Sequence, residues 1–317
     1  MPNGFSPALL VLRDPLESDA GRSTSVNSTT GKSTSANSAS ADSVSGFIAV
    51  DPDSPVVSAL DLGVTRGDGI FETITVVNGM PQALDAHLHR FARSAAMLDL
   101  PAPQPETWKK GVFAAVDSRP TVDEAFAKLV YTRGIEGSGI PTGWIYLQQS
   151  PDFTTERTEG ISVVLLDRGY ASSVQRTSPW LLQGAKTLSY AINKAAAREA
   201  QRRGADDVIF VSSDGYLLEG PTATIVLKLD DTFVTPRTES GILPGTTQQS
   251  IFEIAAVNGY GTAYEMLTPA DLRRAESAWL VSSVRNAAPI REIDGEARPI
   301  DAGLTEAINA GLAARTI

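Results

Sequence analysis

The chain has no cysteine and only two histidines, His87 and His89, among its 317 residues. The absence of cysteine excludes disulfide bonds, thiolate nucleophiles and cysteine-ligated metals. The two histidines lie two positions apart, and on a helix that spacing places them on different faces. We therefore expect one packed and one surface histidine, and no metal site.

Long apolar stretches and an excess of basic residues are missing too. No run reaches the ~18 residues that a transmembrane helix needs, and the N-terminal residues lack the basic start and apolar stretch of a signal peptide. We therefore expect a cytoplasmic protein. The formal net charge is −10 and the pI is about 4.8, which argues against nucleic acid or a membrane as a partner. A small anionic substrate is still compatible with this charge, because a local basic pocket can bind an anion in a protein whose net charge is negative.

Hydrophobic residues make up 42% of the chain, which is enough for a full core. Residues 17–45 differ, because they are mostly Ser, Thr, Ala, Asn, Gly and Asp. Such a segment cannot bury enough apolar surface to offset its ordering entropy. It lies between short strand-like runs at 8–12 and 46–50. We predict a Ser-rich disordered insertion, 17–45, at the tip of a hairpin.

The pattern from residue 59 to residue 149 mixes strands and helices. Residues 70–77 alternate as a strand, Asn78-Gly79 is a strong hairpin turn, and residues 85–98 have helical spacing. A second helix is expected at 107–118, and further strands at 127–132 and 144–148. We predict an α+β fold in which residues 1–16 and 46–150 form a small α+β domain, followed by a polar linker at 150–160.

The second half, residues 151–317, reads as many short strands joined by tight turns. We expect strands at 161–166, 207–211, 222–229 and 278–282, and helices at 190–203, 246–258 and 304–314. This pattern indicates a larger, barrel-like or sandwich-like domain. It carries an amine at Lys186, a carboxylate at Glu219, hydroxyls at a helix start (246–247) and hydroxyls at a strand end (282–283). Together these groups suit a phosphorylated pyridine aldehyde.

Five segments carry a resemblance to a known family. They are residues 66–72 (RGDGIFE), 87–91 (HLHRF), 186–190 (KTLSY), 219–221 (EGP) and 242–247 (ILPGTT). In this order the chain resembles the fold-type IV pyridoxal-phosphate enzymes, which include branched-chain and D-amino-acid aminotransferases and 4-amino-4-deoxychorismate lyases. It looks most like the actinobacterial aminodeoxychorismate lyases. The resemblance implies the two-domain fold of that family, with pyridoxal 5′-phosphate (PLP) bound by the larger domain, 151–317.

The resemblance implies roles for the amine and the carboxylate. Lys186 corresponds to the lysine that forms the Schiff base and carries protons, and burial would lower its pKa from about 10.4. Lys194, one turn beyond Tyr190, is the competing amine. Glu219 corresponds to the partner of the pyridine nitrogen, against the alternative of a solvated glutamate in a turn. The asparagine that the family usually has five residues later is Thr224 here.

The resemblance also implies a phosphate site. Arg90 corresponds to the arginine that grips the phosphate, against the alternative of an exposed arginine paired with a nearby aspartate. Thr246 and Thr247 correspond to the helix start that binds phosphate through backbone N–H groups, although a plain N-cap would use the same residues. Ser282 and Ser283 resemble the second cluster beside the phosphate.

Three further residues complete the implied site. Tyr190 resembles the tyrosine that bonds the phenolic oxygen of the cofactor, and a core tyrosine is the alternative. Phe71 takes a position at the pocket wall where relatives often carry tyrosine. Arg133 leads a glycine-rich loop, 134–139, and would bind a substrate carboxylate, against the alternative of an ordinary loop arginine.

The function implied first is a PLP-dependent 4-amino-4-deoxychorismate lyase, which makes 4-aminobenzoate and pyruvate in folate precursor synthesis. The second hypothesis is an aminotransferase for D-amino acids or branched-chain amino acids, since the cofactor residues would be shared. The third is a cofactor-free binding protein on the same scaffold. The resemblance also implies a homodimer.

Overall fold

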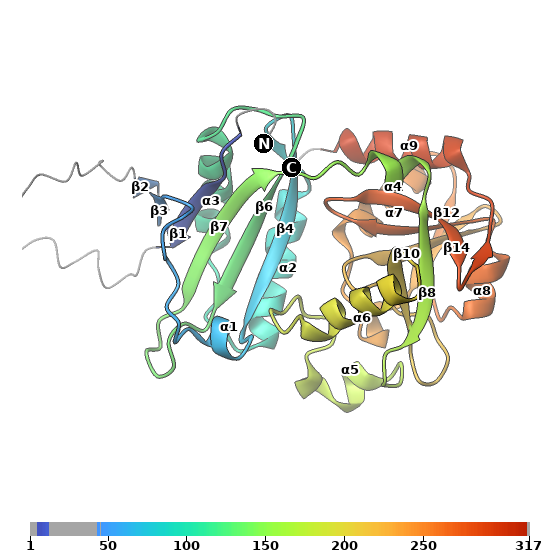
Figure 1. Cartoon of the computed structure of the whole chain (residues 1–317), viewed down its shortest axis with the longest axis horizontal. Helices are drawn as coiled ribbons and strands as arrows, with labels where there is room; N and C mark the ends of the chain where they lie inside the picture. Colours follow the sequence, from blue (N-terminus) through green and yellow to red (C-terminus); the bar gives the residue numbers. More distant parts are fainter. Residues whose placement is uncertain (1–4, 13–42, 45, 316–317) are drawn as a thin grey trace, which may run out of the picture.

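The structure, a computed structural model, describes residues 5–12, 43–44 and 46–315. Two sheets with their helices lie side by side, and the chain crosses between them near residue 150 (Figure 1). The first sheet is built from residues 8–149 and the second from residues 161–297. We propose that these halves are the two domains expected from the sequence. Of the predicted insertion at 17–45, all but residues 43 and 44 lies outside the described residues.

The first sheet is antiparallel throughout. Its order is β2 (Ser43–Val44), β3 (Phe47–Val50), β1 (Ala8–Leu12), β7 (Thr142–Gln149), β6 (Glu124–Thr132), β4 (Gly69–Val77) and β5 (Met80–Pro81). β1 pairs with β3, as the expected hairpin requires. The predicted turn between β4 and β5 is confirmed, because Asn78 and Gly79 have φ angles of 48° and 79°, which match the twist of a tight hairpin.

Helices α2 (Leu84–Met97) and α3 (Pro105–Asp117) cover one face of this sheet. Ile70, Ile74 and Val76 of β4 point toward them and are buried. The rings of Phe91 and Trp108 meet edge to face, with centroids 4.9 Å apart, in the core between sheet and helices. Because side chains alternate along a strand, the residues between these, beginning with Phe71, point to the opposite face.

The second sheet mixes parallel and antiparallel pairs. Its order is β12 (Gly261–Glu265), β11 (Thr232–Pro236), β10 (Thr224–Leu229), β13 (Ser277–Ser282), β14 (Asn286–Ile293), β8 (Ile161–Asp167) and β9 (Asp207–Val211), with β15 (Glu296–Ala297) beside β14. It curls like half of a barrel, which confirms the predicted α+β fold class with a barrel-like larger part (Figure 1).

Three longer helices pack against this sheet: α6 (Ala191–Arg202), α7 (Thr246–Val257) and α9 (Ala302–Ala313). α7 and α9 share a hydrophobic cluster with Trp279 of β13, whose Nε1 donates to Thr305 Oγ1 of α9 at 2.9 Å. The shorter helices are α1 (Leu62–Thr65), α4 (Thr154–Thr158), α5 (Val174–Thr177) and α8 (Pro269–Arg274), with 3₁₀ turns η1 (Pro179–Leu181) and η2 (Thr238–Ser240).

Several elements were not expected from the sequence, among them the strands β11, β12 and β14 and the helix α8. β12 lies at the sheet edge and is mostly exposed, so its residues show no strand-like alternation of burial. α4 lies inside the expected linker. The helix expected from residue 190 begins at Ala191, with Tyr190 as its N-cap. Within the described ranges, no helix is long and apolar enough to cross a membrane.

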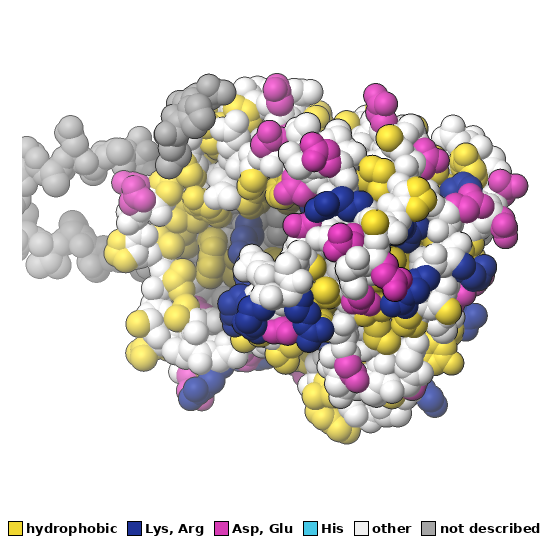
Figure 2. Space-filling view, turned by 45° about the vertical axis from the view of Figure 1, so that its right-hand side comes forward, with side chains coloured by type: hydrophobic (Ala, Val, Ile, Leu, Met, Phe, Trp, Pro, Cys, Tyr) yellow, Lys and Arg dark blue, Asp and Glu magenta, His cyan; other side chains and the backbone are white. Residues whose placement is uncertain are grey.

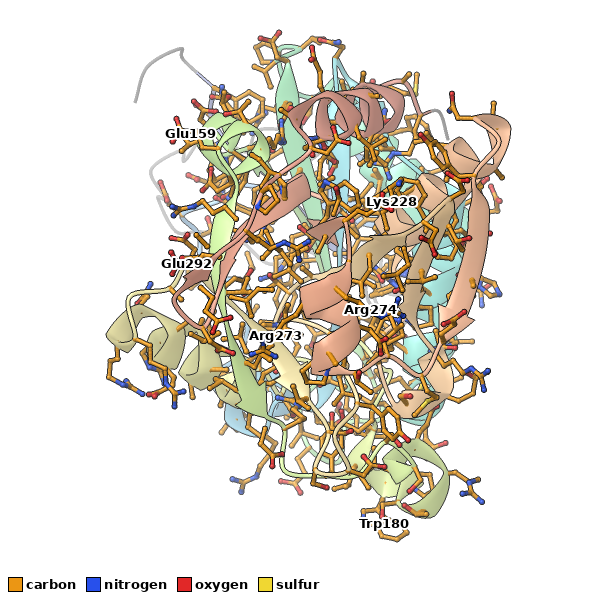
Figure 3. The ribbon with its side chains drawn as sticks, turned by 90° about the vertical axis from the view of Figure 1, so that its right-hand side faces the viewer. Glu159, Trp180, Lys228, Arg273, Arg274 and Glu292 are labelled. Atoms are coloured by element: carbon orange, nitrogen blue, oxygen red, sulfur yellow. The ribbon has the colours of Figure 1, made fainter. Side chains whose placement is uncertain are left out.

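Charged side chains cover the outer side of the second half, where Figure 3 shows Lys228, Arg273 and Arg274. Arg274 pairs with Asp271 at 2.9 Å, and Arg273 pairs with Asp294 at 3.2 Å. These are solvated surface pairs, which contribute little to stability. A space-filling view instead shows a hollow at the junction between the two halves (Figure 2).

Candidate active site

Lys186 lies beside the first residues of β4, where a strand-like pairing joins the two halves of the chain. Phe71 N donates to Lys186 O at 3.0 Å, and Leu188 N donates to Gly69 O at 2.8 Å. A Cβ on Gly69 would stand 2.8 Å from the Leu188 side chain and 2.9 Å from Tyr131 O, so only glycine permits this close pairing. The backbone on both sides of the lysine is therefore fixed by β4.

The side chain of Lys186 is partly buried, with its Nζ 4.5 Å from the centroid of the Phe71 ring. Burial lowers the pKa of Lys186 to about 8, and the positive charges of Arg90 and Lys128 act in the same direction. A much larger share of this amine is therefore neutral near pH 7 than for a solvated lysine, and only the neutral amine attacks a carbonyl. The competing amine, Lys194, lies exposed on α6.

Glu219 enters the same region from the segment after β9. Phe210 of β9 accepts a backbone bond from Leu218 and donates one to Glu219, at 2.8 and 3.0 Å. The Glu219 carboxylate accepts a 3.2 Å bond from Leu243 N. Burial raises the pKa of Glu219 to about 7, opposed by this bond and by the charge of Lys186.

Among the described residues Glu219 forms no ion pair. With no close cation among these residues, burial raises its pKa, and a buried carboxylate is stabilised when a cation is supplied. A protonated pyridine nitrogen is such a cation. The expectation that Glu219 points inward agrees with its position, while its role toward the ring nitrogen stays a proposal.

Arg90 of α2 is buried, with 8% of its surface exposed, and it binds Glu72 of β4 in a two-pronged ion pair. Its Nε lies 2.7 Å from Glu72 Oε1 and its Nη2 lies 2.8 Å from Glu72 Oε2, while Nη1 donates to Pro244 O at 2.9 Å. The alternative considered above, an exposed arginine paired with Asp85 or Asp99, is wrong. Arg90 instead reaches across to the turn that precedes α7.

Glu72 is completely buried and still ionised. Burial opposes its charge, but Arg90 and His87 overcome that effect and hold the pKa of Glu72 well below its usual range. Removing either partner would leave an uncompensated charge in the interior. The Glu72–Arg90 pair is therefore a fixed charge arrangement, not a titrating one.

His87 is a site residue that the sequence reasoning did not select. Its Nδ1 lies 2.8 Å from Glu72 Oε2, and its Nε2 lies 3.2 Å from Thr246 Oγ1 and 3.3 Å from Ser283 Oγ. Burial lowers the pKa of His87, although Glu72 opposes this. The signal that could have found it is its spacing of three residues from Arg90 on one helix face. His89 is exposed, as expected for the second histidine.

The start of α7 forms the far end of this group. Thr246 and Thr247 are buried, and no side chain caps the helix at Gly245. Thr247 Oγ1 is buried and has no hydrogen-bond partner among residues 5–12, 43–44 and 46–315. A Cβ on Gly245 would stand 2.4 Å from Thr224 Oγ1. Thr224, which replaces the asparagine usual in the family, therefore packs directly against the turn before α7. Free N–H groups at a helix start and an unused hydroxyl fit an anion such as phosphate.

Ser282 is the last residue of β13, and Ser283 follows it in the turn that faces His87. The Ser283 carbonyl accepts a bond from Thr75 Oγ1 of β4, and its hydroxyl faces His87. Ser282 lies opposite Asn286 at the start of β14. The structure thus brings residues from α2, α7 and the turn after β13 together. Of the groups predicted to bind phosphate, Arg90, Thr246 and Ser283 lie at His87.

Tyr190 and Phe71 lie at the lysine end. Their rings meet edge to face with centroids 5.4 Å apart. The Tyr190 hydroxyl donates to Pro221 O at 2.6 Å, and burial raises the pKa of Tyr190 to about 12. The tyrosine is therefore a neutral hydrogen-bond donor beside the turn that follows Glu219.

Arg133 is not brought to the group around Lys186. Its Nε lies 2.6 Å from Asp68 Oδ2, and its Nη2 donates to Leu98 O at 2.6 Å. These contacts tie the end of β6 to the turn before β4 and to the end of α2. Because its guanidinium is already engaged, the structure shows no free group for a carboxylate at this position.

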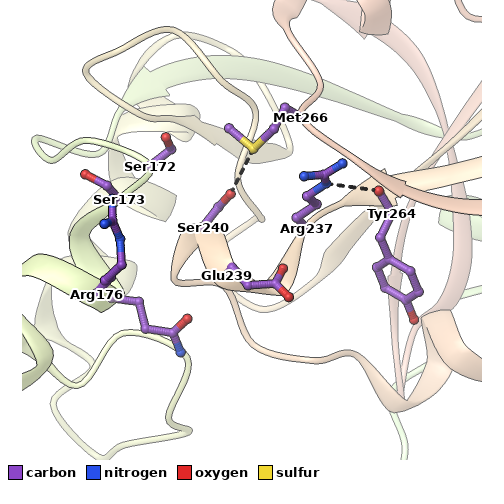
Figure 4. Close-up of a pocket in the computed structure, with 9 residues that line it drawn as sticks. Ser172, Ser173, Arg176, Arg237, Glu239, Ser240, Tyr264 and Met266 are labelled. Atoms are coloured by element: carbon purple, nitrogen blue, oxygen red, sulfur yellow. Dashed lines mark hydrogen bonds between the residues drawn. The ribbon is translucent and has the colours of Figure 1, made fainter.

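A separate hollow of about 630 Å³ lies between α5, η2 and the end of β12. Figure 4 shows Arg176, Arg237 and Glu239 around it, and neither Lys186 nor Glu219 contributes to its lining. Most of these side chains are exposed. The groups that can perform chemistry therefore gather at the junction of the two halves and not in this hollow. Among the described residues, no cluster of three or more His, Cys, Asp or Glu side chains could hold a metal ion.

The junction site and the fold define a class of protein. The chain matches the amino-transferase class IV family over residues 69–293, and it belongs to that family. Its relatives include the bifunctional aminodeoxychorismate lyase / D-amino acid transaminase of Mycobacterium tuberculosis. That protein is 42% identical over 260 residues, which cover 79% of this chain and 90% of the relative.

Solved structures agree. A fold IV transaminase from Curtobacterium pusillum is 47% identical, with a TM-score of 0.86 over 97% of both chains. A hypothetical aminotransferase from Mycobacterium tuberculosis, solved with PLP bound, is 41% identical, with a TM-score of 0.80 over 84% of this chain and 96% of that chain. The chain is therefore a fold-type IV enzyme that uses PLP, and the hypothesis of a cofactor-free binding protein is set aside.

Proposed function

We propose that the chain is a 4-amino-4-deoxychorismate lyase. The observation that carries the proposal is that the Lys186 amine and the Glu219 carboxylate lie at the junction of the two halves, together with the predicted phosphate site around His87. Burial moves the pKa of the amine down to about 8 and that of the carboxylate up to about 7. General acid–base groups work best when their pKa lies near the operating pH. The M. tuberculosis relative named for lyase activity supports this assignment.

The residues divide the task as follows. Bound PLP supplies an electron sink for the charge that develops on the substrate. Lys186 would hold the cofactor and, once free, take the proton from the carbon that bears the substrate amine. Glu219 would keep a positive charge on the pyridine nitrogen. Arg90 and the start of α7 would hold the phosphate.

The reaction balances without a further reactant. Lys186 removes one proton, the bond from the ring carbon to the enolpyruvyl oxygen breaks, and the ring becomes aromatic. The leaving enol takes up a proton and becomes pyruvate, while 4-aminobenzoate is released. Because substrate and products have the same total composition, no oxidant or amino acceptor is required.

The direct test is to incubate the purified holoenzyme with 4-amino-4-deoxychorismate. We expect equal amounts of pyruvate and 4-aminobenzoate, and no product with the Lys186→Ala variant. Absence of both products from the wild-type holoenzyme rejects the lyase assignment.

A second candidate function is an aminotransferase acting on D-amino acids or branched-chain amino acids. It is supported by the C. pusillum relative, which is named a transaminase, and by the M. tuberculosis structure in its alpha-ketoglutarate and PMP bound form. The two functions share the first proton removal and differ in the fate of the charge. Mixing the holoenzyme with D-alanine or leucine and measuring the oxo acid formed would show whether this activity is present.

Lys128 of β6 supports an anionic substrate. Its Nζ lies 5.4 Å from the Phe71 ring centroid, on the ring that Lys186 also approaches. Desolvation and the charge of Lys194 lower the pKa of Lys128, and among the described residues it has no ion-pair partner. A substrate with two carboxylates would supply the missing negative charge. In Lys128→Met we expect KM to rise more for the lyase substrate than for D-alanine.

We also propose a homodimer. On the open face of the first sheet, Phe126, Trp144 and Tyr146 share the side of Phe71 and are only partly buried. Exposed apolar patches of this kind mark interfaces. Figure 2 shows hydrophobic side chains at the surface of the first half, beside the hollow. Sedimentation of the holoenzyme at twice the monomer mass would support the dimer.

A further inference from the structure

Arg157 is the arginine of α4, the short helix in the crossing between the two halves. Its Nη1 lies 2.6 Å from Glu124 Oε1 and its Nη2 lies 2.8 Å from Glu124 Oε2. Its Nε donates to Arg285 O at 2.9 Å, and its Nη2 also donates to Val284 O at 3.0 Å. A single guanidinium thus binds β6 of the first half and a turn of the second half.

That turn follows directly on the serines at the end of β13. From the first half, the Ser283 carbonyl accepts a bond from Thr75, and the Ser283 hydroxyl faces His87. From the second half, the side chain of Arg285 pairs with Asp207 at 2.8 Å. Thr75, the Arg285–Asp207 pair and Arg157 therefore all hold the turn, and Arg157 binds the carbonyls of Val284 and Arg285.

We propose that Arg157 is a positioning residue for the phosphate end of the site. The fork to Glu124 fixes the plane of its guanidinium, and the other edge of the same plane holds the carbonyls of Val284 and Arg285. This placement keeps Ser283 facing His87 and Thr246. The inference rests on the proposed phosphate role of these groups.

The chemistry of the side chain favours this role over a general contribution to stability. Arginine presents several donors in a rigid fork, whereas lysine is a point charge that cannot bind a carboxylate and two carbonyls in one plane. The Arg157 and Glu124 side chains are 17% and 32% exposed, so the pair lies outside the hydrophobic cores. Partly exposed pairs contribute little to folding, but groups that orient site residues affect ligand affinity.

The experiment compares PLP with pyridoxal, which lacks the phosphate. Cofactor is exchanged out of the purified holoenzyme, and the Kd of each compound is measured by absorbance for wild type, Arg157→Ala, Arg157→Lys and Glu124→Gln. We expect the Kd of PLP to rise about 10- to 100-fold in Arg157→Ala, as for other orienting residues. The Kd of PLP in Arg157→Lys should lie between the values for wild type and Arg157→Ala. The Kd of pyridoxal should change less than about twofold in all variants.

Arg291 provides a matched control. It also binds a backbone carbonyl, Gly160 O at 3.2 Å, and an acid, Asp206 at 3.2 Å, but it does not touch the Ser283 turn. Arg291→Lys should leave both constants unchanged. An unchanged Kd for PLP in the Arg157 variants, or an equal rise for PLP and pyridoxal, overturns the inference.

The outcomes separate this inference from the site on which it rests. A wild-type enzyme that binds pyridoxal as tightly as PLP has no phosphate site at α7 and Ser283, and both proposals fall. If wild type binds PLP more tightly than pyridoxal and Arg157→Ala keeps the same ratio of Kd values, only the positioning role of Arg157 is rejected. If Arg157→Ala does not fold, the ratio of the Kd of pyridoxal to the Kd of PLP in Arg157→Lys and Glu124→Gln tests the positioning role instead.

Discussion

The two ends of the site handle charge in opposite ways. At the lysine end, Lys186 and Glu219 form no close ion pair with any residue that the structure describes, and burial moves both toward neutrality, with pKa values of about 8 and about 7. At the phosphate end, Glu72 is completely buried, but Arg90 and His87 bond it directly and hold its pKa far below its usual range. The partly buried groups thus titrate near neutral pH, whereas the more deeply buried Glu72 keeps a permanent charge.

The difference lies in hydrogen bonding. A buried carboxylate that accepts several charged bonds stays ionised, whereas one with a single backbone bond is pushed toward its neutral form. The lysine end can therefore exchange protons near neutral pH, as a catalytic site requires. At the phosphate end, the charges of Glu72 and Arg90 stay the same over this pH range, so the electrostatic environment of a bound anion does not change. The predictions below test this contrast, from the largest effect to the smallest.

Removing the amine should have the largest effect. We expect Lys186→Ala to lower activity by roughly 10³-fold or more, because proton transfer and cofactor attachment are both lost. Reduction of the holoenzyme with borohydride followed by peptide mapping should label Lys186 in the wild type. Lys194→Ala is the matched control and should retain activity and label. A label on Lys194 would contradict the assignment.

Breaking the buried charge pair should mainly affect folding. In Glu72→Gln we expect the free energy of unfolding to fall by about 3–5 kcal/mol, because Arg90 is left buried without its partner. Urea denaturation measures this. Arg202→Ala, which breaks a pair with Glu199 at the surface, should cost less than about 1 kcal/mol. Equal losses in the two variants would remove the distinction between the buried and exposed pairs.

Changing the carboxylate at the lysine end should affect catalysis more than folding. We expect Glu219→Gln to reduce kcat by about 10²-fold, while the free energy of unfolding stays near the wild-type value or rises, because a costly buried acid is removed. Glu239→Gln, on the nearby exposed η2 turn, is the control and should match wild type. A Glu219→Gln enzyme with normal kcat would show that this group is structural.

The pH dependence of stability should separate the two titrating groups in PLP-free enzyme. Between pH 4.5 and about 7 the folded chain keeps a proton on Glu219 that the unfolded chain has lost, so stability falls as pH rises. Between about pH 8 and 10.5 the unfolded chain keeps a proton on Lys186 that the folded chain has lost, so stability rises. Urea titrations across both windows measure these slopes.

Two variants assign these slopes. Glu219→Gln should lack the fall between pH 4.5 and 7, and Lys186→Met should lack the rise above pH 8. Glu72 has the opposite sign to Glu219, since its contribution is lost only as pH falls below 4.5. Variants with the wild-type slopes would show that other groups set the pH profile.

The smallest effect is expected at the unused hydroxyl. Thr247→Val removes Oγ1, which has no hydrogen-bond partner in the described part of the chain, and preserves the shape of the side chain. We expect a few-fold rise in the Kd of PLP and no loss of folding stability, because a buried unsatisfied group is eliminated. Thr235→Val, whose hydroxyl donates to Ile225 O at 2.7 Å, should instead lose stability and leave the Kd unchanged.

Much of the fold could be predicted where local signals were strong. The alternation of residues 70–77, the Asn78-Gly79 turn and the helices α2, α6 and α7 follow from periodicity and turn chemistry, and the structure places them within a few residues. β12 was missed because an exposed edge strand lacks alternation. α8 was missed because it is only six residues long, although its start at Thr268 carries a capping box with Asp271.

The site residues were predicted by resemblance and are brought together in part. Lys186, Glu219, Arg90, Thr246 and Ser283 meet at the junction although up to 193 positions separate them in the sequence. Arg133 does not join them, since Asp68 engages it. His87 was overlooked although it lies three residues before Arg90 on the same helix face, because that spacing alone does not show its partners, Glu72, Thr246 and Ser283, which come from three distant segments.

The amino-acid sequence determined the local elements, the family and the candidate amine and carboxylate, because turn chemistry, side-chain periodicity and motif order are properties of neighbouring residues. Tertiary structure alone decided which charges are paired. Glu72 and Glu219 are the same residue type, and only packing gives one a guanidinium and an imidazole and the other a single backbone N–H. Their opposite pKa shifts arise from contacts between segments far apart in the chain, and these contacts form only when the chain folds.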